Sequence, residues 1–335
     1  MNKIINRPDD MVSEMAEGYE RMYSSMYKKV NLGSICAITK KNIPEDKVTI
    51  VIGGGCGNEP WLMGFVGEGL ADAVVLGRVY VAPPAKAILK LTKQIPNNKG
   101  VLYIATNHAG DVLNFELVRE LAQLEGISTK AAYLCDDLSS SKFDDKENRR
   151  GIAGIALFVK ILAAAAESGF SLEQLESLAK EINKNISTFS VTTSTGYMPG
   201  TNKAMCSLPD GEIEYGMGFN GEMGIIHSDL KPADEIVNTM MDLLVKDLNL
   251  SKGQEVSIFL NGFGFTSVLE LCIVARRIHE YAEQFGLNIH DQFLDQLLCP
   301  QGTGGFSITI LKMEDSYKKF YDAQCYSPLY FKKQM

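Results

Sequence analysis

Short apolar runs alternate with helix-like segments along the first half of the chain. Three runs have the continuous apolar character of buried strands and end in glycines or polar residues: VTIVIGGG (48–55), GVLYIATNHAGD (100–111) and KAAYLCDD (130–137). Helical spacing of apolar positions is found at 114–126, 151–169 and 171–185. Alternation of strands and helices predicts βαβ units and a mostly parallel sheet.

The second half of the chain has a different pattern, in which glycine-rich turns follow the strand-like runs. We expect strands within 212–224, 255–266 and 305–313 and helices at 232–248 and 267–286. The pattern changes near 186–195, at ISTFSVTTSTG. We therefore predict an α/β protein with two α/β domains and mainly parallel sheet, over residues 1–190 and 191–335.

Composition and charge narrow the classes of partner. The 335 residues carry 33 basic and 41 acidic side chains, a formal net charge of −8. Nucleic acids and anionic membranes both attract a basic surface, so neither is an expected partner. No apolar stretch reaches about 18 residues, and the N-terminus MNKIINRPDD lacks the apolar core of a signal peptide.

The seven cysteines indicate a reducing compartment. They are scattered, odd in number and contain no CxxC pair. This pattern argues against a disulfide framework and against a structural zinc site, so no metal is expected. Free thiols are typical of the cytoplasm, which is the expected location.

Four loops share one design, in which a buried strand ends in glycines and polar groups. They are GGGCGNEP (53–60), ATNHAGD (105–111), GMGFNGEMG (216–224) and NGFGFT (261–266). Ligands of open α/β sheets bind at the carboxyl ends of strands, and glycines there let backbone N–H groups approach the ligand closely. Tight turns alone would explain any one loop, whereas all four together indicate a binding site. The first loop is not a P-loop, because no GK[ST] follows it.

These loops carry a resemblance to a known family. GGGCGNEP followed by GFVGEGL (64–70) resembles the G-G-G-S-G-H-E-P…G-(F/Y)-(V/I)-G-x-G-M signature of the DhaK-type substrate-binding subunit of dihydroxyacetone kinases. Further segments resemble motifs of the same family, in the same order: INRPDDMVSEMAEG (5–18), NHAGDVLNFE (107–116), NRRGIAG (148–154), MGFNGEMG (217–224) and GGFSITILKM (304–313). Because the match extends over nearly the whole chain, the protein is identified as DhaK-like.

The resemblance implies a two-domain α/β subunit, usually a homodimer, that binds dihydroxyacetone or a similar short polyol or keto-sugar. In this family a histidine of the G-I-H-G-E-P-G loop holds the substrate as a covalent hemiaminal, and a second histidine, in G-G-G-S-G-H-E-P, assists. The aspartate that closes N-Y-T-G-D acts as base on the substrate hydroxyl. The phosphoryl donor is held elsewhere, for example on a nucleotide-binding DhaL-type subunit, so no cofactor is expected on this chain.

The sequence departs from the family pattern at the expected pocket. The covalent histidine falls on Asn220 and the assisting histidine on Asn58, while a lysine falls on Thr106 and a serine on Ala82. An amide nitrogen is not nucleophilic at neutral pH, so Asn220 cannot form the hemiaminal. Asn58 can form hydrogen bonds but cannot transfer a proton. Since the base is kept as Asp111, the sequence predicts impaired or altered activity rather than none.

The candidate site residues follow from these motifs. Asp111 and His108 are the catalytic candidates, and the substrate-binding candidates are Gly54, Gly55, Asn58, Thr106 and Asn220. His108 takes the place of the tyrosine in N-Y-T-G-D, where it either touches ligand or replaces an aromatic packing group. We expect the loops that carry these residues to converge on one cavity at the carboxyl ends of strands.

Other polar and aromatic residues have structural interpretations. His279 and His290 lie in or beside a helix and are expected to be ordinary structural histidines. His227 is expected to lie beyond the pocket, and Trp61 is expected in the core rather than in a pocket wall. The pair Asp136–Asp137 could bind a metal, although helix capping explains two aspartates after a strand at least as well.

The sequence leaves three classes of function open. The first is a working kinase subunit that acts with a partner carrying the nucleotide. The second is a non-catalytic paralogue, such as a ligand-sensing co-activator or regulator, and the third is a sugar-binding module with an unrelated use. Fold alone cannot distinguish them, because function depends on the site. The preserved framework makes the kinase subunit the primary hypothesis, whereas the two asparagines favour the second class or a changed substrate.

Overall fold

The computed structural model describes residues 3–198, 201 and 203–333, which form two compact units. The Asp111 unit comprises the chain up to Leu134, Ile155–Glu181 and the chain from Asp315. The Asn220 unit comprises Cys135–Gly154 and Ile182–Glu314. Each unit is thus assembled from segments far apart in sequence. This division differs from the expected single boundary at residue 190, which falls within the Asn220 unit.

The sheet of the Asp111 unit is mainly parallel, as predicted. Its strands are β1 (Tyr27–Asn31), β2 (Cys36–Lys40), β3 (Thr49–Cys56), β4 (Ala73–Val79), β5 (Val101–Thr106) and β6 (Thr129–Leu134). They lie in the order β1-β2-β4-β3-β5-β6. Parallel pairs join β4 to β3, β3 to β5 and β5 to β6, while β1 and β2 add an antiparallel edge.

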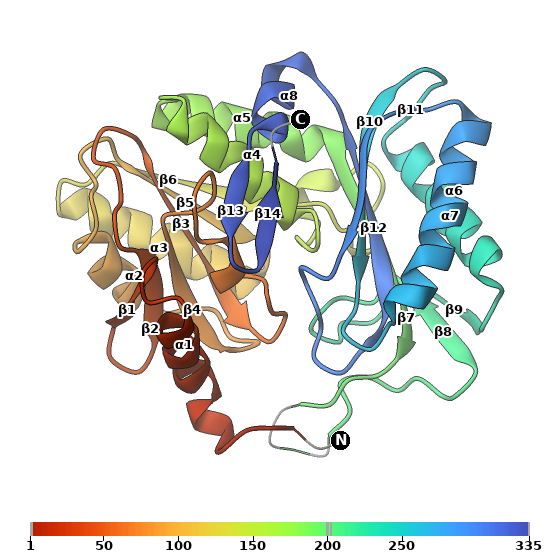
Figure 1. The fold of residues 1–335 in the computed structure, drawn as a ribbon, viewed down its shortest axis with the longest axis horizontal. Helices are drawn as coiled ribbons and strands as arrows, with labels where there is room; N and C mark the ends of the chain where they lie inside the picture. The colour runs from red at the N-terminus through yellow and green to blue at the C-terminus, as the bar shows by residue number, and fades with distance from the viewer. Residues whose placement is uncertain (1–2, 199–200, 202, 334–335) are drawn as a thin grey trace. The chain divides into compact units, whose positions relative to one another are not determined.

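Helices cover this sheet because its central strands are apolar toward both faces. Val51 and Tyr103 lie in a core cluster with residues of α2 (Ala85–Thr92) and α3 (Ala109–Leu124). α4 (Ile155–Glu167), drawn in green in Figure 1, packs against β3 and β5 although it comes from a later part of the chain. The first twelve residues of α4 are all buried, and the helix lies within the segment 151–169 where helical spacing was found.

The C-terminal segment completes the same unit. α8 (Asp315–Asp322) packs against α4, and the hairpin of β13 (Cys325–Ser327) and β14 (Tyr330–Lys332) follows it. The fully buried Lys160 of α4 donates hydrogen bonds from Nζ to the carbonyls of Phe320 and Ala323, at 2.9 and 2.7 Å. α1 (Met11–Met22) contacts β1, β2 and β4. The sequence analysis did not predict these elements.

The sheet of the Asn220 unit is mainly antiparallel, so the expectation of mainly parallel sheet was wrong here. Its strands are β7 (Ile186–Ser194), β8 (Glu212–Tyr215), β9 (Ile226–Asp229), β10 (Glu255–Gly262), β11 (Asn288–Asp295) and β12 (Gly304–Lys312), in the order β11-β10-β12-β7-β8-β9. Only β10 and β11 pair in parallel, and α7 (Val268–Phe285) connects them as a crossover. The other neighbours pair antiparallel, which needs no crossover helix.

The core of the Asn220 unit lies between its sheet and two helices. α6 (Ala233–Asp247) and α7 contact each other and the central strands, as Figure 1 shows. α7 begins with a capping box formed by Ser267 and Glu270 and ends at Gly286, whose φ of 86° is left-handed. The sequence therefore located this helix closely.

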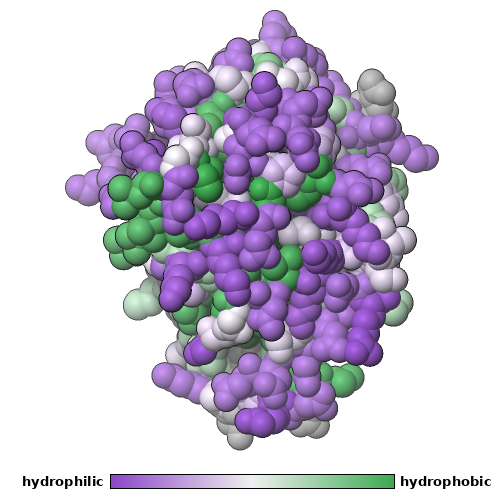
Figure 2. Space-filling model, turned by 90° about the vertical axis from the view of Figure 1, so that its left-hand side faces the viewer, coloured by the Kyte–Doolittle hydropathy of each residue, from purple (hydrophilic) through white to green (hydrophobic). Residues whose placement is uncertain are grey.

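The remaining helical elements are α5 (Leu172–Asn185) and four short 3-10 turns, η1 (Pro8–Asp10), η2 (Met63–Phe65), η3 (Leu138–Ser140) and η4 (Lys146–Asn148). α5 runs directly into β7, so no loop separates them. The surface seen in Figure 2 is mostly hydrophilic with hydrophobic groups scattered over it. Within the part of the chain that the structure describes, no helix is long and apolar enough to span a bilayer.

Candidate functional site

Asp111 lies in the first turn of α3, just past the carboxyl end of β5. The sequence placed this aspartate in a loop and began the helix at 114, five residues too late. Gly110, a poor helix former, obscured the true start. An acidic residue in the first turn also complements the positive end of the helix dipole. The backbone of Asp111 is therefore held by regular structure rather than by a loop.

The Asp111 carboxyl group is buried and only partly hydrogen-bonded. Its side chain is 6% exposed, and Thr106 Oγ1 donates to its Oδ2 at 3.4 Å. Oδ1 is buried without a hydrogen-bond partner among the described residues. Burial raises the pKa of Asp111 to about 7, and the hydrogen bond from Thr106 opposes this rise. Such a group can exchange a proton near neutral pH, as a general base must.

Two of the predicted glycines lie at the end of β3 and serve different purposes. A Cβ atom placed on Gly54 would lie 3.8 Å from Asp111 Oδ1, so the absence of a side chain leaves space beside the carboxylate. A Cβ atom on Gly55 would lie 2.7 Å from the backbone nitrogen of Val81, which is too close for any side chain. Gly54 therefore borders the carboxylate, and Gly55 allows the chain after β4 to pass close to β3.

The loop that carries Asn58 is braced by the chain after β4. A Cβ atom on Gly57 (φ 119°) would lie 2.6 Å from the ring of Tyr80, so that ring packs directly on the glycine. Tyr80 itself has a left-handed φ of 57°, a strained value for a bulky side chain that is typical of functional loops. Gly57 N donates to Glu59 Oε1 at 2.9 Å. Asn58 is half-buried at the centre of this loop.

Thr106 and His108 join Asp111 in one group. Thr106 is the last residue of β5, and His108 immediately precedes α3. His108 Nδ1 lies 3.0 Å from Thr106 Oγ1, the same oxygen that bonds to Asp111. His108 thus has a polar contact where the sequence left open either ligand contact or aromatic packing. The structure brings together Gly54, Thr106, His108 and Asp111, whose roles remain predictions.

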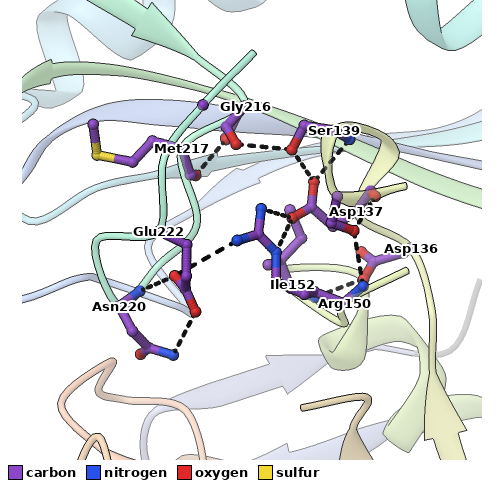
Figure 3. Close-up of polar contacts among 12 residues, drawn as sticks. Asp136, Asp137, Ser139, Arg150, Ile152, Gly216, Met217, Asn220 and Glu222 are labelled. Atoms are coloured by element: carbon purple, nitrogen blue, oxygen red, sulfur yellow. Dashed lines mark hydrogen bonds and ion pairs between the residues drawn. The ribbon is translucent and has the colours of Figure 1, made fainter. Parts of the chain in front are cut away.

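Asn220 lies in a tight turn of the Asn220 unit that is closed by Glu222 (Figure 3). Gly218 N donates to Glu222 O at 3.0 Å, and Gly221, with a φ of 87°, donates to Gly218 O at 3.1 Å. The Glu222 carboxylate accepts from Asn220 N at 3.0 Å and from Asn220 Nδ2 at 3.4 Å. Glu222 therefore orients both the backbone and the side chain of Asn220.

Arg150 connects this turn to the segment after β6. Its Nη1 lies 3.9 Å from Glu222 Oε2, and its Nε and Nη2 lie 3.0 and 2.9 Å from Asp137 Oδ2. Ser139 Oγ donates to Asp137 Oδ1 and also lies 2.8 Å from Gly216 O, as Figure 3 shows. The sequence did not predict roles for Arg150 or Glu222. The signal was present, since both lie within the matched motifs NRRGIAG and MGFNGEMG.

We predict that Glu222→Ala loosens the Asn220 turn without unfolding the unit. The substitution removes the acceptor of Asn220 N and one of the two acidic partners of Arg150. Amides of residues 217–222 should exchange with deuterium at least about tenfold faster, which corresponds to about 1.4 kcal/mol of lost local protection. Hydrogen exchange with mass spectrometry measures this directly. Glu235→Ala, at an exposed position of α6, is the matched control; unchanged exchange in Glu222→Ala would contradict the role of Glu222.

Asp136 and Asp137 are structural in the described fold. Asp136 is fully buried and accepts hydrogen bonds from Ile152 N at 2.6 Å, Gly154 N at 2.8 Å and the Thr188 hydroxyl. Asp137 accepts from Ser139 N at 3.0 Å and so caps η3. The capping interpretation is therefore confirmed for Asp137. Across residues 3–198, 201 and 203–333, no three His, Cys, Asp or Glu side chains gather in a way that could hold a metal ion.

The other histidines and Trp61 lie where structural roles were expected. His227 on β9 lies 2.5 Å from Glu212 on β8, at an exposed position. His279 pairs with Glu283 on α7, and His290 lies 3.4 Å from Glu255. Trp61 is 5% exposed and packs edge-on against Phe65, which confirms the core interpretation.

Asn220 belongs to the Asn220 unit, whereas the other candidate residues belong to the Asp111 unit. The convergence of the loops that carry these candidate residues on a single cavity therefore stays a prediction.

These features define an α/β protein with a polar site at the carboxyl ends of parallel strands, built around a buried carboxyl group and close-packed glycines. Comparison with known proteins specifies the class. The Dak1 domain model matches residues 17–329. The chain therefore belongs to the Dak1 domain family.

Individual relatives agree over nearly the full length. A Listeria innocua protein named PTS-dependent dihydroxyacetone kinase 2, dihydroxyacetone-binding subunit DhaK, is 33% identical over 332 residues, which cover 99% of each chain. The native crystal structure of the dihydroxyacetone kinase of C. freundii superposes with a TM-score of 0.88 at 26% identity, over 97% of this chain and 59% of that one. The dihydroxyacetone kinase operon co-activator DhaQ superposes with a TM-score of 0.86 at 27% identity, over 93% and 96% of the two chains.

Proposed function

We propose that this chain is the substrate-binding subunit of a dihydroxyacetone kinase system, which presents dihydroxyacetone or a related short polyol or keto-sugar for phosphorylation. The observation that carries the proposal is the Asp111 carboxyl group, which is buried, borders Gly54 and has one oxygen without a hydrogen-bond partner in the described part of the chain. A ligand hydroxyl can donate to that oxygen. Because burial raises the pKa of Asp111 to about 7, the ionised group can accept the hydroxyl proton as phosphoryl transfer proceeds.

The phosphoryl donor is proposed to reach the ligand from a partner. The Listeria innocua relative is named as the dihydroxyacetone-binding subunit of a PTS-dependent kinase. This name supports a model in which one subunit binds the ligand and another supplies the phosphoryl group. We propose a DhaL-type nucleotide-binding subunit, or a regulator, as protein partner and a homodimer as the assembly of this chain. None of the seven cysteines, all of which lie in the described part of the chain, forms a disulfide, which supports a reducing, cytoplasmic setting.

Two measurements test the proposal. Isothermal titration with dihydroxyacetone, erythrulose and glycerol should give saturable binding to the ketoses. Addition of a purified nucleotide-binding subunit of a dihydroxyacetone kinase with its phosphoryl donor should then yield dihydroxyacetone phosphate. If none of the three ligands binds, the substrate-binding role is refuted.

We predict that the bound ketone forms no covalent adduct with this protein. Covalent capture requires a nucleophilic nitrogen, and the amide of Asn220 has its lone pair delocalised into the carbonyl group. Binding through hydrogen bonds to Asp111, Asn58 and loop amides should be weak, since a ligand of so few atoms offers little contact. Intact-protein mass spectrometry after incubation with dihydroxyacetone should show only the unmodified mass.

Asn220→His is the informative variant for this prediction. It restores an imidazole at the position where the family resemblance implies the covalent histidine. An adduct on the variant alone would show that the turn still presents the ketone correctly. An adduct on the unmodified chain would overturn the prediction, and His108 would then be the first nucleophile to test.

A second candidate function is a ligand-sensing regulator without catalysis of its own. It is favoured by the likeness to the co-activator DhaQ over 96% of that chain, together with asparagines at positions 58 and 220. The two functions differ in one outcome. A regulator should bind ligand yet give no dihydroxyacetone phosphate with a competent nucleotide-binding subunit, whereas the kinase subunit should give both.

A further inference from the structure

We infer that His108 is a positioning residue for Asp111 and acts on it through the hydroxyl group of Thr106. The inference rests on the proposed function only in taking Asp111 as the base. It concerns two side chains that differ from the family motif. The resemblance implies a lysine where this chain has Thr106 and a tyrosine where it has His108. A charged group is thus absent at 106, and a titratable imidazole is present two residues later.

The chemistry of the three groups sets the direction of the hydrogen bonds. An ionised carboxylate only accepts, so Thr106 Oγ1, which has a single proton, donates it to Asp111 Oδ2 across 3.4 Å. The same oxygen lies 3.0 Å from His108 Nδ1 and must therefore accept from it. The chain of donors runs from His108 to Thr106 to Asp111. It holds Oδ2, whereas Oδ1 has no hydrogen-bond partner among the described residues; both oxygens border the space beside Gly54.

The backbone keeps this arrangement in place. Thr106 ends β5, and His108 N donates to Thr106 O at 2.8 Å across the intervening residue. Val112 N donates to His108 O at 2.9 Å and so ties His108 to the first turn of α3. Since a strand end and a helix start fix the three side chains, small changes in His108 are transmitted to the carboxylate.

Other titratable groups near Asp111 are less directly connected to it. Tyr133 on β6 interacts with Asp111 electrostatically, but its hydroxyl donates to Glu116 at 2.8 Å. Arg119 in turn pairs with Glu116. On β3, the residue that borders Asp111 is Gly54, which has no side chain and therefore no charge. The hydrogen-bonded path to a titratable side chain therefore leads through Thr106 to His108.

The experiment measures the pKa of Asp111 itself, in the full-length protein without ligand. Aspartate labelled with 13C at Cγ is titrated by NMR, and the Asp111 signal is assigned by its loss in Asp111→Asn. A donor to the ionised form lowers a carboxyl pKa, so its removal should raise that pKa. We expect a rise of about one pH unit in Thr106→Val and of about half a pH unit in His108→Phe. His108→Asn, which keeps a donor near the Nδ1 position, should return the value toward that of the unmodified protein.

A double variant tests whether His108 acts through Thr106. In the Thr106→Val background, His108→Phe should change the pKa of Asp111 by less than about a third of its effect alone, because coupled residues give non-additive effects. His279→Phe, an exposed histidine of α7, is the matched control and should change nothing. The inference is overturned if His108→Phe leaves the pKa unchanged, if its effect is equally large without the Thr106 hydroxyl, or if His108→Asn fails to restore the value. None of these readouts requires ligand, so they fail or succeed independently of the proposed function.

Discussion

Asp111→Asn is expected to stabilise the folded protein by about 1–3 kcal/mol at pH 8 and to leave its stability at pH 4 nearly unchanged. The folded-state pKa of about 7 lies above the ordinary value of 3.8. Between pH 4 and pH 7 the folded protein therefore binds more protons at this site than the unfolded chain, and stability is lost as pH rises through that window. An uncharged amide removes this cost, so the gain should be complete only above pH 7.

Urea unfolding at pH 4, 6 and 8 measures the effect. Asp46→Asn, at an exposed position in the same unit, is the matched control and should shift stability by less than about 0.5 kcal/mol.

In the reconstituted kinase the same Asp111→Asn substitution should lower turnover by at least about 100-fold, since a general base is lost. Opposite effects on stability and turnover would identify a carboxyl group kept for function at the expense of stability. A variant that is less stable at pH 8 would contradict the buried, partly unpaired state of Asp111.

Arg149→Ala is expected to destabilise the Asn220 unit by about 3–5 kcal/mol. Arg149 is fully buried, and its Nη1 and Nη2 lie 2.8 and 2.7 Å from the two oxygens of Asp247. Removing Arg149 leaves the buried carboxylate with only Lys146 as a cationic partner, whose Nζ lies 3.8 Å from Asp247 Oδ2. Breaking a buried pair in this way costs more than the pair itself contributes. Although burial opposes it, hydrogen bonding from Arg149 and the charge of Lys146 hold the pKa of Asp247 below its ordinary value.

Two comparisons make this prediction specific. Arg276→Ala breaks exposed ion pairs to Asp234 and Glu280 and should cost less than about 1 kcal/mol. The double substitution Arg149→Met with Asp247→Leu should recover much of the loss, because the buried guanidinium and the buried carboxylate are then both absent and only the partly exposed Lys146 loses a partner. The stabilisation of Asp247 is present above pH 4 and disappears as pH falls through its lowered pKa, so the cost of Arg149→Ala should shrink in acid. A cost below about 1 kcal/mol at pH 7 would contradict the inferred role of the buried pair.

The candidate site shows what motifs can and cannot predict. Glycines and an aspartate after strands indicated Gly54 and Asp111 as neighbours, because the carboxyl ends of parallel strands meet at one edge of a sheet. The contact of His108 with Thr106 depends on where α3 begins, and Gly110 concealed that start. Glu222 and Arg150 are 72 residues apart in sequence, and only the folded chain brings them within 3.9 Å.

The sequence by itself determined the local elements and the character of the first sheet. Continuous apolar runs located β3, β5 and β6, and the helix-like segment 267–286 located α7. Such patterns are visible in the sequence because strands and helices repeat their buried positions at short, regular intervals. Tertiary structure decided the antiparallel pairing of β12, β7, β8 and β9 and the raised pKa of Asp111. It also decided which separate segments of the chain form each of the two units. Those properties depend on which distant surfaces bury one another. A strand has the same alternation of side chains whichever direction its neighbour runs, and a carboxyl group loses water only when other parts of the chain close over it.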